Sequence, residues 1–365
     1  MCGHLPSGRV PPAESPPVGV FRAHFEYLCE DRPAFRRDDP DPYPDQPGPG
    51  QALIRTTLST ICGSDMHLVD EMPIPAGVPM GHEAIGVVEA VGAGVTNFKA
   101  GDRVASGCLA CCGMCKRCQE GDHSVCETFN APGNLLFGAQ GEYFLVNGAQ
   151  AGLAKVPDSL SDEQVLFVTD IMSTGFAAIE RAGIRTGDTV AIFAQGPVGL
   201  CATAGARALG AGRIIAVESI PERVAMSKRF GADIVLDPAD AVAKIQQMTG
   251  NRGVDIAVEA LGHQATFANA CASVRIGGTV SSVGVYGAFP ELTMATGGTF
   301  IHRKLVTTLC PVGTNRLERL MALIAGGTVD LTPLLTHSMK ISDTPAGYDL
   351  FRKREGGVLK IALRP

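Results

Sequence analysis

The middle of the chain alternates short apolar strands with helical segments, and this alternation limits the fold more than any other feature. TVAIFAQ (189–195), RIIAVE (213–218) and VDIAVEALG (254–262) are apolar runs, whereas VGLCATAGARALG (198–210) and PERVAMSKRFG (221–231) have helical spacing. Strands that lack a polar face are buried on both sides, and strands joined through helices run parallel. This part of the chain therefore predicts an α/β domain in which helices cover both faces of a parallel sheet.

A glycine-rich turn, AQGPVG (194–199), connects the first of these strands to the following helix. Such a turn lets pyrophosphate oxygens meet backbone N–H groups at the helix start. Ala194 stands where the G-x-G-x-x-G pattern has its first glycine, and a βα turn that binds no nucleotide is the alternative interpretation. Gly196 permits close approach of the backbone and Gly199 close packing of the helix, so the expected cofactor contacts are Gly196, Pro197, Val198 and Gly199.

Glu218 ends the next strand, about 20 residues after the turn. A carboxylate at this position accepts hydrogen bonds from both ribose hydroxyls of NAD and repels the 2′-phosphate of NADP. A solvated strand end is the alternative. The turn and Glu218 together predict NAD as the cofactor.

Six cysteines lie between Cys108 and Cys126, and four of them have the spacing C-x2-C-x2-C-x7-C: Cys112, Cys115, Cys118 and Cys126. Zinc takes four ligands in a tetrahedron, and C-x2-C spacing lets one turn offer two thiolates. In a reducing cytosol, clustered cysteines indicate a metal more often than disulfides. The spacing predicts a closed, structural zinc site, with unliganded thiols as the alternative. Cys108 and Cys111 have no role in this interpretation.

A second set of metal-binding residue types is dispersed along the chain. CGSDMH (62–67) contains Cys62, and GHE (81–83) contains His82. Each residue alone is more often an ordinary buried side chain. Together with the four cysteines, the GxVG turn and the acidic strand end, these motifs resemble the zinc-dependent medium-chain alcohol dehydrogenases, near their bacterial secondary-alcohol branch. The resemblance implies a β-rich GroES-like catalytic domain and a Rossmann-type, doubly wound parallel-sheet domain.

The resemblance also implies roles for individual residues. Cys62 and His82 match two ligands of the catalytic zinc, and Asp170, in VTDIMSTGF (168–176), matches the third. A helix cap is the alternative role for Asp170. Asp65 matches the carboxylate that orients the ligating histidine, and Glu83 matches an exchangeable ligand. The fourth position then stays open to water or alcohol.

Two further residues complete the implied site. Ser64 takes the proton of the alcohol and passes it through the cofactor ribose towards His67, whose ordinary pKa of roughly 6.5 suits a proton relay. A turn hydroxyl and a surface histidine are the alternative interpretations. The implied enzyme carries two zinc ions per subunit and oxidises a secondary alcohol reversibly by hydride transfer to NAD.

The secondary-alcohol branch often lacks the four-cysteine site and uses NADP, so this chain combines features of several branches. A polyol or butanediol dehydrogenase and a formaldehyde dehydrogenase-like enzyme are the enzymatic alternatives. A zinc-ribbon interaction protein is the alternative that is not an enzyme. The resemblance also implies a homodimer or homotetramer, formed by pairing of residues 276–305 across a two-fold axis.

The length of 365 residues favours two domains. Glycine-punctuated strands such as QALIRTTLST (51–60) predict a β-rich first domain. The pattern changes at STGFAAIERAGI (173–184), a helix with Ser173 or Thr174 as its expected N-cap. The predicted domain ranges are 1–173, with 1–20 poorly ordered, then 174–309 for the nucleotide-binding domain, and 310–365 for a return to the first.

Composition excludes several partners. The net charge is −6 and no dense Lys/Arg run occurs, which argues against nucleic acid or an anionic membrane surface. No apolar run reaches about 18 residues, so a membrane span is not expected. The N-terminal segment lacks the apolar region of a secretory signal, which predicts a cytoplasmic protein. The expected partner is a small alcohol or ketone.

Overall fold

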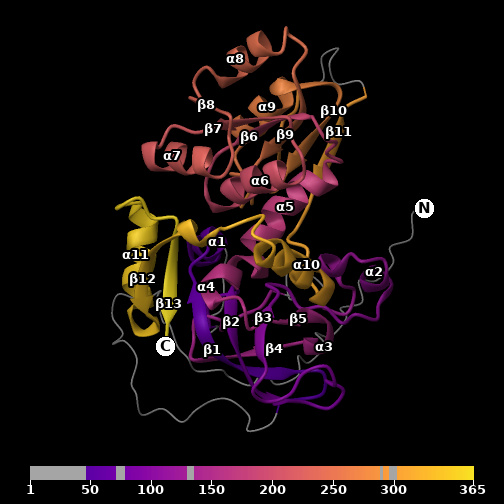
Figure 1. The fold of residues 1–365 in the computed structure, drawn as a ribbon, viewed down its shortest axis with the longest axis vertical. Coiled ribbons are helices and arrows are strands. Elements are labelled where there is room, and N and C mark those ends of the chain that lie inside the picture. The colour runs from indigo at the N-terminus through magenta and orange to yellow at the C-terminus, as the bar shows by residue number, and fades with distance from the viewer. Residues whose placement is uncertain (1–46, 71–78, 130–134, 288–290, 296–301) are drawn as a thin grey trace, which may run out of the picture.

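The computed structural model describes residues 47–70, 79–129, 135–287, 291–295 and 302–365, which form two β-sheets in two halves of an elongated molecule (Figure 1). The predicted disorder of residues 1–20 lies outside the described residues. Among the helices of the described ranges, none has the length and apolar character needed to cross a membrane.

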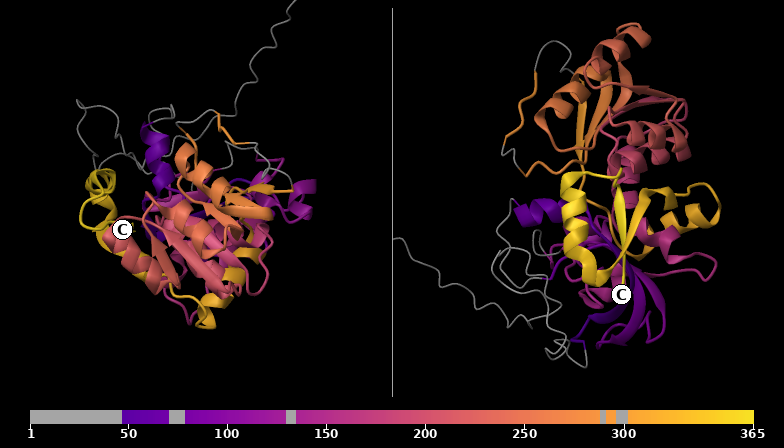
Figure 2. Two further views of the ribbon diagram at one scale, coloured as in Figure 1. Left: turned by 90° about the horizontal axis from the view of Figure 1, so that it is seen from above. Right: turned by 90° about the vertical axis from the view of Figure 1, so that its left-hand side faces the viewer.

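The first sheet has seven strands: β1 (Ala52–Thr60), β2 (Ala84–Val91), β3 (Arg103–Ser106), β4 (Tyr143–Val146), β5 (Leu153–Lys155), β12 (Leu335–Lys340) and β13 (Lys360–Arg364). The order is β12-β13-β1-β2-β3-β5, with β4 also paired to β1. Strand β13 runs antiparallel to β1, so the C-terminal segment joins a sheet that is otherwise built from the first third of the described chain. Figures 1 and 2 show this segment, in yellow, beside the indigo strands.

The second sheet has six parallel strands: β6 (Thr189–Phe193), β7 (Arg213–Val217), β8 (Ile234–Leu236), β9 (Val254–Glu259), β10 (Val274–Ser282) and β11 (Lys304–Thr307). The order is β11-β10-β9-β6-β7-β8. Alternate residues of β6 pack into two different cores. Val190 and Ile192 lie in the core with α5 and α6, whereas Ala191 and Phe193 lie in the core with α8 and α9. The predicted doubly wound parallel sheet is therefore confirmed.

The described helices are α1 (Gly63–Asp70), α2 (Lys116–Gln119), α3 (Ala149–Gly152), α4 (Asp162–Val165), α5 (Ile171–Arg181), α6 (Pro197–Ala208), α7 (Pro221–Arg229), α8 (Ala241–Met248), α9 (Gln264–Ser273), α10 (Thr314–Ala325) and α11 (Thr344–Lys353). Short 3-10 helices occur at η1 (His123–Val125), η2 (Leu166–Thr169), η3 (Thr332–Leu334) and η4 (Ile341–Asp343). Helices α5 and α6 pack closely because Gly175 has no side chain. A Cβ atom there would clash with Cys201 and Ala202.

Helix α5 begins at Ile171, with Asp170 at the N-cap position, rather than at the expected N-cap Ser173 or Thr174. The hydroxyls of those two residues have other partners. Ser173 Oγ donates to the carbonyl of Pro311 at 2.6 Å, and Thr174 Oγ1 donates to Asp170 Oδ1 at 3.0 Å. The predicted boundary between residues 173 and 174 therefore falls inside α5.

Candidate active site and metal centres

Cys62, His82 and Asp170 converge on one point, and together they are called the Cys–His–Asp cluster below. Asp170 Oδ2 lies 3.7 Å from Cys62 Sγ and 3.3 Å from His82 Nε2. With Glu83 included, the four possible ligand atoms all lie within 4.8 Å of one another. The structure therefore brings together three side chains that are far apart in the sequence.

Strand pairing explains how two of these residues meet. Strands β1 and β2 run antiparallel, with Ser59 opposite Ala84. Cys62 follows the end of β1 and His82 precedes the start of β2, so both lie at the same end of this pair of strands. Asp170 enters from the turn between η2 and α5, and its side chain makes no capping bond to the helix.

A chain of buried hydrogen-bonding groups supports the His82 ring. Nδ1 of His82 lies 3.0 Å from Asp65 Oδ1, and Asp65 Oδ2 accepts from the backbone N–H of Cys62 and from Gln140 Nε2, both at 2.9 Å. Gln140 Oε1 accepts in turn from the hydroxyl of Tyr348, on α11, at 2.9 Å. A carboxylate at Nδ1 fixes the tautomer that leaves Nε2 free for a metal.

The charges of the cluster are strongly coupled. Burial favours the neutral imidazole, but Asp65 and the hydrogen bond with Asp170 raise the pKa of His82 well above its ordinary value. Burial opposes ionisation of Asp170, yet its contact with His82 outweighs this and lowers the pKa of the carboxyl. Burial raises the pKa of the Cys62 thiol. A divalent cation between these groups would favour the thiolate, the neutral imidazole and the carboxylate, because metal binding releases protons from its ligands.

Glu83 forms an ion pair with Lys360, and both side chains are fully buried. Lys360 Nζ, on β13, donates to the two carboxylate oxygens at 2.7 and 2.9 Å. Burial raises the pKa of Glu83 to about 7, although the ammonium group opposes the shift. Lys360 thus holds the carboxylate that the sequence interpretation assigned as an exchangeable ligand. Sequence reasoning missed Lys360, although a lysine inside the apolar run VLKIAL was a usable signal.

Ser64 and His67 lie on helix α1, three residues apart and so on one face of it. The hydroxyl of Ser64 lies 3.2 Å from His82 Nε2, the same ring nitrogen that faces Asp170. His67 is half-buried one turn further along the helix. The structure therefore places Ser64 beside the Cys–His–Asp cluster. His67 lies on the same face of α1, one turn further from the cluster.

The donor set of the cluster fits zinc. One thiolate, one imidazole and one carboxylate are the ligand types of catalytic zinc sites, which use three protein ligands and leave one position open. Two anionic ligands also balance the charge of the ion. Cys62 and His82 are buried, while Asp170 keeps 14% of its side chain exposed.

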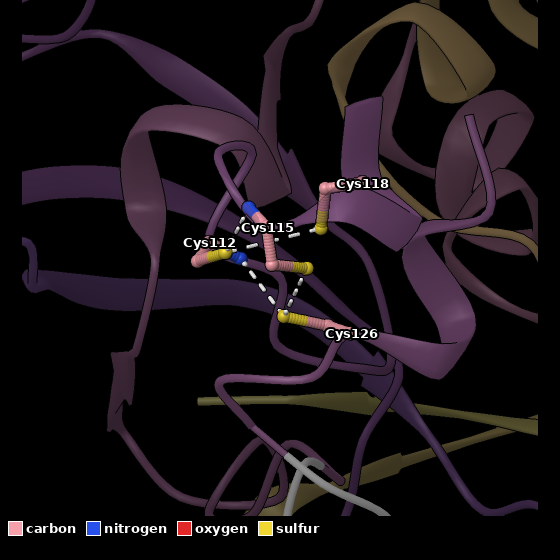
Figure 3. Close-up of side chains that lie close together, drawn as sticks. All are labelled: Cys112, Cys115, Cys118 and Cys126. Atoms are coloured by element: carbon pink, nitrogen blue, oxygen red, sulfur yellow. Dashed lines mark hydrogen bonds between the residues drawn. The ribbon is translucent and has the colours of Figure 1, made fainter. Parts of the chain in front are cut away.

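The second candidate metal centre, called the four-cysteine site, consists of Cys112, Cys115, Cys118 and Cys126 beside α2 and η1 (Figure 3). The sulfur atoms of Cys112 and Cys118 lie 4.0 Å apart, and those of Cys115 and Cys126 lie 3.9 Å apart. A tetrahedral zinc ion with bonds of about 2.3 Å requires sulfurs roughly 3.8 Å apart. The four thiols are therefore already near the separations that zinc needs.

Backbone groups favour the thiolate form in the four-cysteine site. The N–H groups of Met114 and Cys115 donate to Cys112 Sγ at 3.4 and 3.2 Å. Burial opposes ionisation, but these bonds and one from the Thr128 side chain lower the pKa of Cys112 to about 6. The neighbouring Cys111 is buried outside the four, and burial raises the pKa of its thiol to about 12.

The glycine turn has the shape of a phosphate-binding loop. Gly196 is the N-cap of α6, and a Cβ atom there would meet nothing within 4 Å, so the approach to the helix start is open. A Cβ atom on Gly199 would lie 2.0 Å from the carbonyl oxygen of Ala194. Ala194 itself has a φ of 72°, the left-handed conformation that the glycine of the usual motif adopts easily. Pro197 and Val198 form the first helical residues.

Glu218 follows β7 and joins this turn. Its carboxylate accepts from the backbone N–H of Gln195 at 3.0 Å, and from those of Ser219 and Ile220 at 2.8 and 3.1 Å. The turn and Glu218 thus lie at the carboxyl ends of adjacent parallel strands β6 and β7, where doubly wound sheets bind nucleotides.

Comparison with known proteins agrees with this architecture. Residues 48–158 match the alcohol dehydrogenase GroES-like domain, and residues 197–326 match the zinc-binding dehydrogenase family. An alcohol dehydrogenase of Cupriavidus necator is 44% identical over 89% of this chain and 94% of its own length. The NADP-dependent isopropanol dehydrogenase of Thermoanaerobacter brockii is 37% identical over 84% of this chain and 88% of its own.

A solved structure, alcohol dehydrogenase TADH from Thermus sp. ATN1, superposes with a TM-score of 0.80 at 33% identity, covering 88% of this chain and 94% of that one. The expected family, the GroES-like and Rossmann-type fold and the reaction class are confirmed, and the zinc-ribbon interaction protein is set aside. The chain belongs to the zinc-dependent medium-chain alcohol dehydrogenases, oxidoreductases that act on alcohols.

Proposed function

We propose that this enzyme oxidises a secondary alcohol to a ketone, reversibly, with NAD as the hydride acceptor. In this proposal Cys62, His82 and Asp170 hold the catalytic zinc, and the four-cysteine site holds a structural zinc. The observation that carries the proposal is the convergence of those three side chains at Asp170 Oδ2, within 3.7 Å. The reducing conditions that free thiolates require fit a cytoplasmic enzyme.

A zinc ion held by these three residues supplies a Lewis acid that favours loss of the alcohol proton. The protein residues have separate tasks around it. Asp65, fixed by Gln140, keeps the His82 ring oriented with Nε2 towards the cluster. Ser64, 3.2 Å from that nitrogen, accepts the proton, and His67 passes it to solvent. Lys360 binds both carboxylate oxygens of Glu83 and holds that side chain in place beside the cluster.

The preference for NAD rests on Glu218. Its position at the end of β7 would place a carboxylate against the ribose hydroxyls and against a 2′-phosphate. The Thermoanaerobacter brockii relative is named as NADP-dependent, so the preference needs a direct test. Replacing Glu218 with Ala should lower the ratio of kcat/KM for NAD over NADP at least about tenfold.

The control for this experiment is Glu218→Gln, which removes the charge and keeps one acceptor oxygen, enough for the backbone N–H of Gln195 or for that of Ser219. If charge sets the preference, both variants shift the ratio, whereas Glu218→Ala loosens the turn more than Glu218→Gln, because it removes both acceptor oxygens. An unchanged ratio in both variants would contradict the assignment of NAD through Glu218.

The substrate is tested by initial rates with propan-2-ol, butane-2,3-diol, ethanol, sorbitol and formaldehyde, each with both cofactors. A secondary-alcohol dehydrogenase turns over propan-2-ol with the highest kcat/KM. A higher value for sorbitol or butane-2,3-diol would support the polyol alternative. A higher value for formaldehyde would support the formaldehyde dehydrogenase-like alternative.

We also propose that the enzyme is a homodimer or homotetramer. Strand β11 is an edge of the parallel sheet, and Leu305 on it is 48% exposed. Ile276, on the neighbouring strand β10, is 57% exposed, and Leu309, two residues after β11, is 46% exposed. An exposed apolar edge strand favours pairing with a second copy. Light scattering that shows a monomer would contradict this assembly. The domain ranges 1–173, 174–309 and 310–365 likewise remain a proposal.

A further inference from the structure

Two buried thiols behind Asp170 have no role in the proposed reaction. Cys108 follows β3 and Cys310 follows β11, so they come from opposite halves of the chain, and both are nearly inaccessible to solvent. The backbone N–H of Cys108 donates to the carbonyl of Thr169 at 3.0 Å, and Cys310 Sγ donates to the carbonyl of Asp170 at 3.4 Å. The two cysteines therefore flank the backbone that presents Asp170.

These thiols and the Asp170 carboxylate form a set of potential ligands. Their two sulfur atoms and one carboxylate oxygen all lie within 4.8 Å of one another. A tetrahedral metal with sulfur bonds of about 2.3 Å needs sulfurs roughly 3.8 Å apart, so only a small adjustment is required. The sulfur separations of 3.9 and 4.0 Å in the four-cysteine site are close to this value.

We propose that Cys108, Cys310 and Asp170 form a third, inhibitory site for a soft divalent cation, such as zinc in excess or cadmium. The proposal rests on the role of Asp170 in the proposed function. Binding replaces the two S–H bonds with two metal–sulfur bonds and releases two protons, so a divalent ion and two thiolates add no net charge to the buried site. Thiolates select soft cations over magnesium or calcium.

Sharing of Asp170 explains why binding at the third site inhibits the enzyme. The same carboxylate that faces Cys62 and His82 also belongs to the set with Cys108 and Cys310. A cation bound to the two thiols draws the carboxylate away from the Cys–His–Asp cluster or bridges it to a second positive charge. Asp170 is the one partly exposed member of the set, and it provides the route of entry.

The test uses the zinc-loaded enzyme, equilibrated by dialysis against a series of free Zn²⁺ concentrations. Zinc per chain and the rate of alcohol oxidation are measured together. We expect wild-type enzyme to bind a third equivalent and to lose activity in parallel with it. Cys108→Ala and Cys310→Ala, each compared with its own rate without added zinc, should weaken both effects at least about tenfold. Cys271→Ala removes a buried thiol on α9, away from the set, and should behave like wild type.

Cadmium added to the zinc-loaded wild type and to Cys310→Ala provides a second measurement, since cadmium–thiolate bonds absorb in the near ultraviolet and those of the four-cysteine site are common to both proteins. The additional absorption of the wild type should appear with the loss of activity. Absence of a third equivalent, or equal inhibition of the two cysteine variants and Cys271→Ala, would overturn the third site. Fewer than two zinc ions in the resting enzyme would instead overturn the proposed function, while the difference in cadmium absorption between wild type and Cys310→Ala would still report on the third site.

Discussion

The four-cysteine site takes all its thiols from residues 112–126, whereas the Cys–His–Asp cluster takes its ligands from three segments and its supporting groups from others as distant as Tyr348 and Lys360. The four-cysteine site is formed by one loop, and backbone N–H groups of that loop donate hydrogen bonds to its sulfur atoms. The Cys–His–Asp cluster is a buried point where β1, β2, α5, α11 and β13 meet. A local site can form wherever its loop folds, while a dispersed site requires the whole domain.

Among variants that distinguish the two sites, Cys126→Ser is expected to change zinc content and stability most. Cys126 is buried and is the one ligand outside the C-x2-C-x2-C run, so its loss opens the four-cysteine site. We expect zinc to fall from two ions to one per chain and the free energy of unfolding to fall by about 3 kcal/mol or more. Metal analysis and denaturant unfolding measure these changes.

Turnover per remaining zinc should stay close to wild type in the folded Cys126→Ser enzyme, because this site has no open position for substrate. If turnover disappears from enzyme that is still folded and still holds one zinc, the separation between a structural and a catalytic site is wrong.

The next largest effect concerns the ion pair that supports the cluster. Lys360→Met leaves the carboxylate of Glu83 buried without its partner, which costs about 3–5 kcal/mol. The double variant Lys360→Met, Glu83→Gln removes the uncompensated charge and should recover part of that loss. Urea unfolding of both proteins measures the difference, and equal stability of the single and double variants would show that the pair is not coupled.

A smaller effect is expected from the hydrogen-bond chain behind His82. Gln140→Leu removes the amide that binds Asp65, and Tyr348→Phe removes only the hydroxyl that binds Gln140. Loss of such outer partners weakens metal binding about 10–100-fold. A chelator should therefore extract the catalytic zinc faster from both variants, and most rapidly from Gln140→Leu.

The zinc of the four-cysteine site is the internal control in the same sample, because neither residue touches it. Its extraction rate should not change. Equal acceleration at both sites would mean that the variants loosen the whole domain rather than orient His82.

The smallest effect is expected at Met114, which lies between two zinc ligands but is 78% exposed. Met114→Ala should change the free energy of unfolding by no more than about 0.5 kcal/mol and leave zinc content unchanged. A large loss of zinc would show that the four-cysteine site depends on more than its own sulfurs and backbone.

The difference between a local and a dispersed site also decides which features can be predicted from the sequence. The four-cysteine site and the glycine turn can be predicted from spacing, because their residues are neighbours in the chain. The parallel sheet can be predicted because its strands are continuously apolar. Cys62, His82 and Asp170 have no such spacing, and only a family resemblance connects them. Gln140, Tyr348 and Cys310 reach the site through strand pairing and helix docking, which the local sequence does not encode.

Helix α5 shows why the boundaries of elements are harder to predict. Ser173 and Thr174 have the residue types of an N-cap, but a tertiary contact with Pro311 and a local bond to Asp170 use their hydroxyls instead. The helix therefore begins earlier, and Asp170 is left at its start with a side chain that faces Cys62 and His82. The expected N-cap signal was overridden next to Asp170, the residue proposed as a metal ligand.

The most direct test of the account measures zinc content, turnover and NAD binding in freshly purified, unchelated wild-type enzyme and in Asp170→Ala. We predict two zinc ions per chain in the wild type and one in the variant, with no turnover but nearly intact NAD binding in the variant. An Asp170→Ala enzyme that keeps two zinc ions and turns over alcohol near the wild-type rate would contradict the assignment of the Cys–His–Asp cluster.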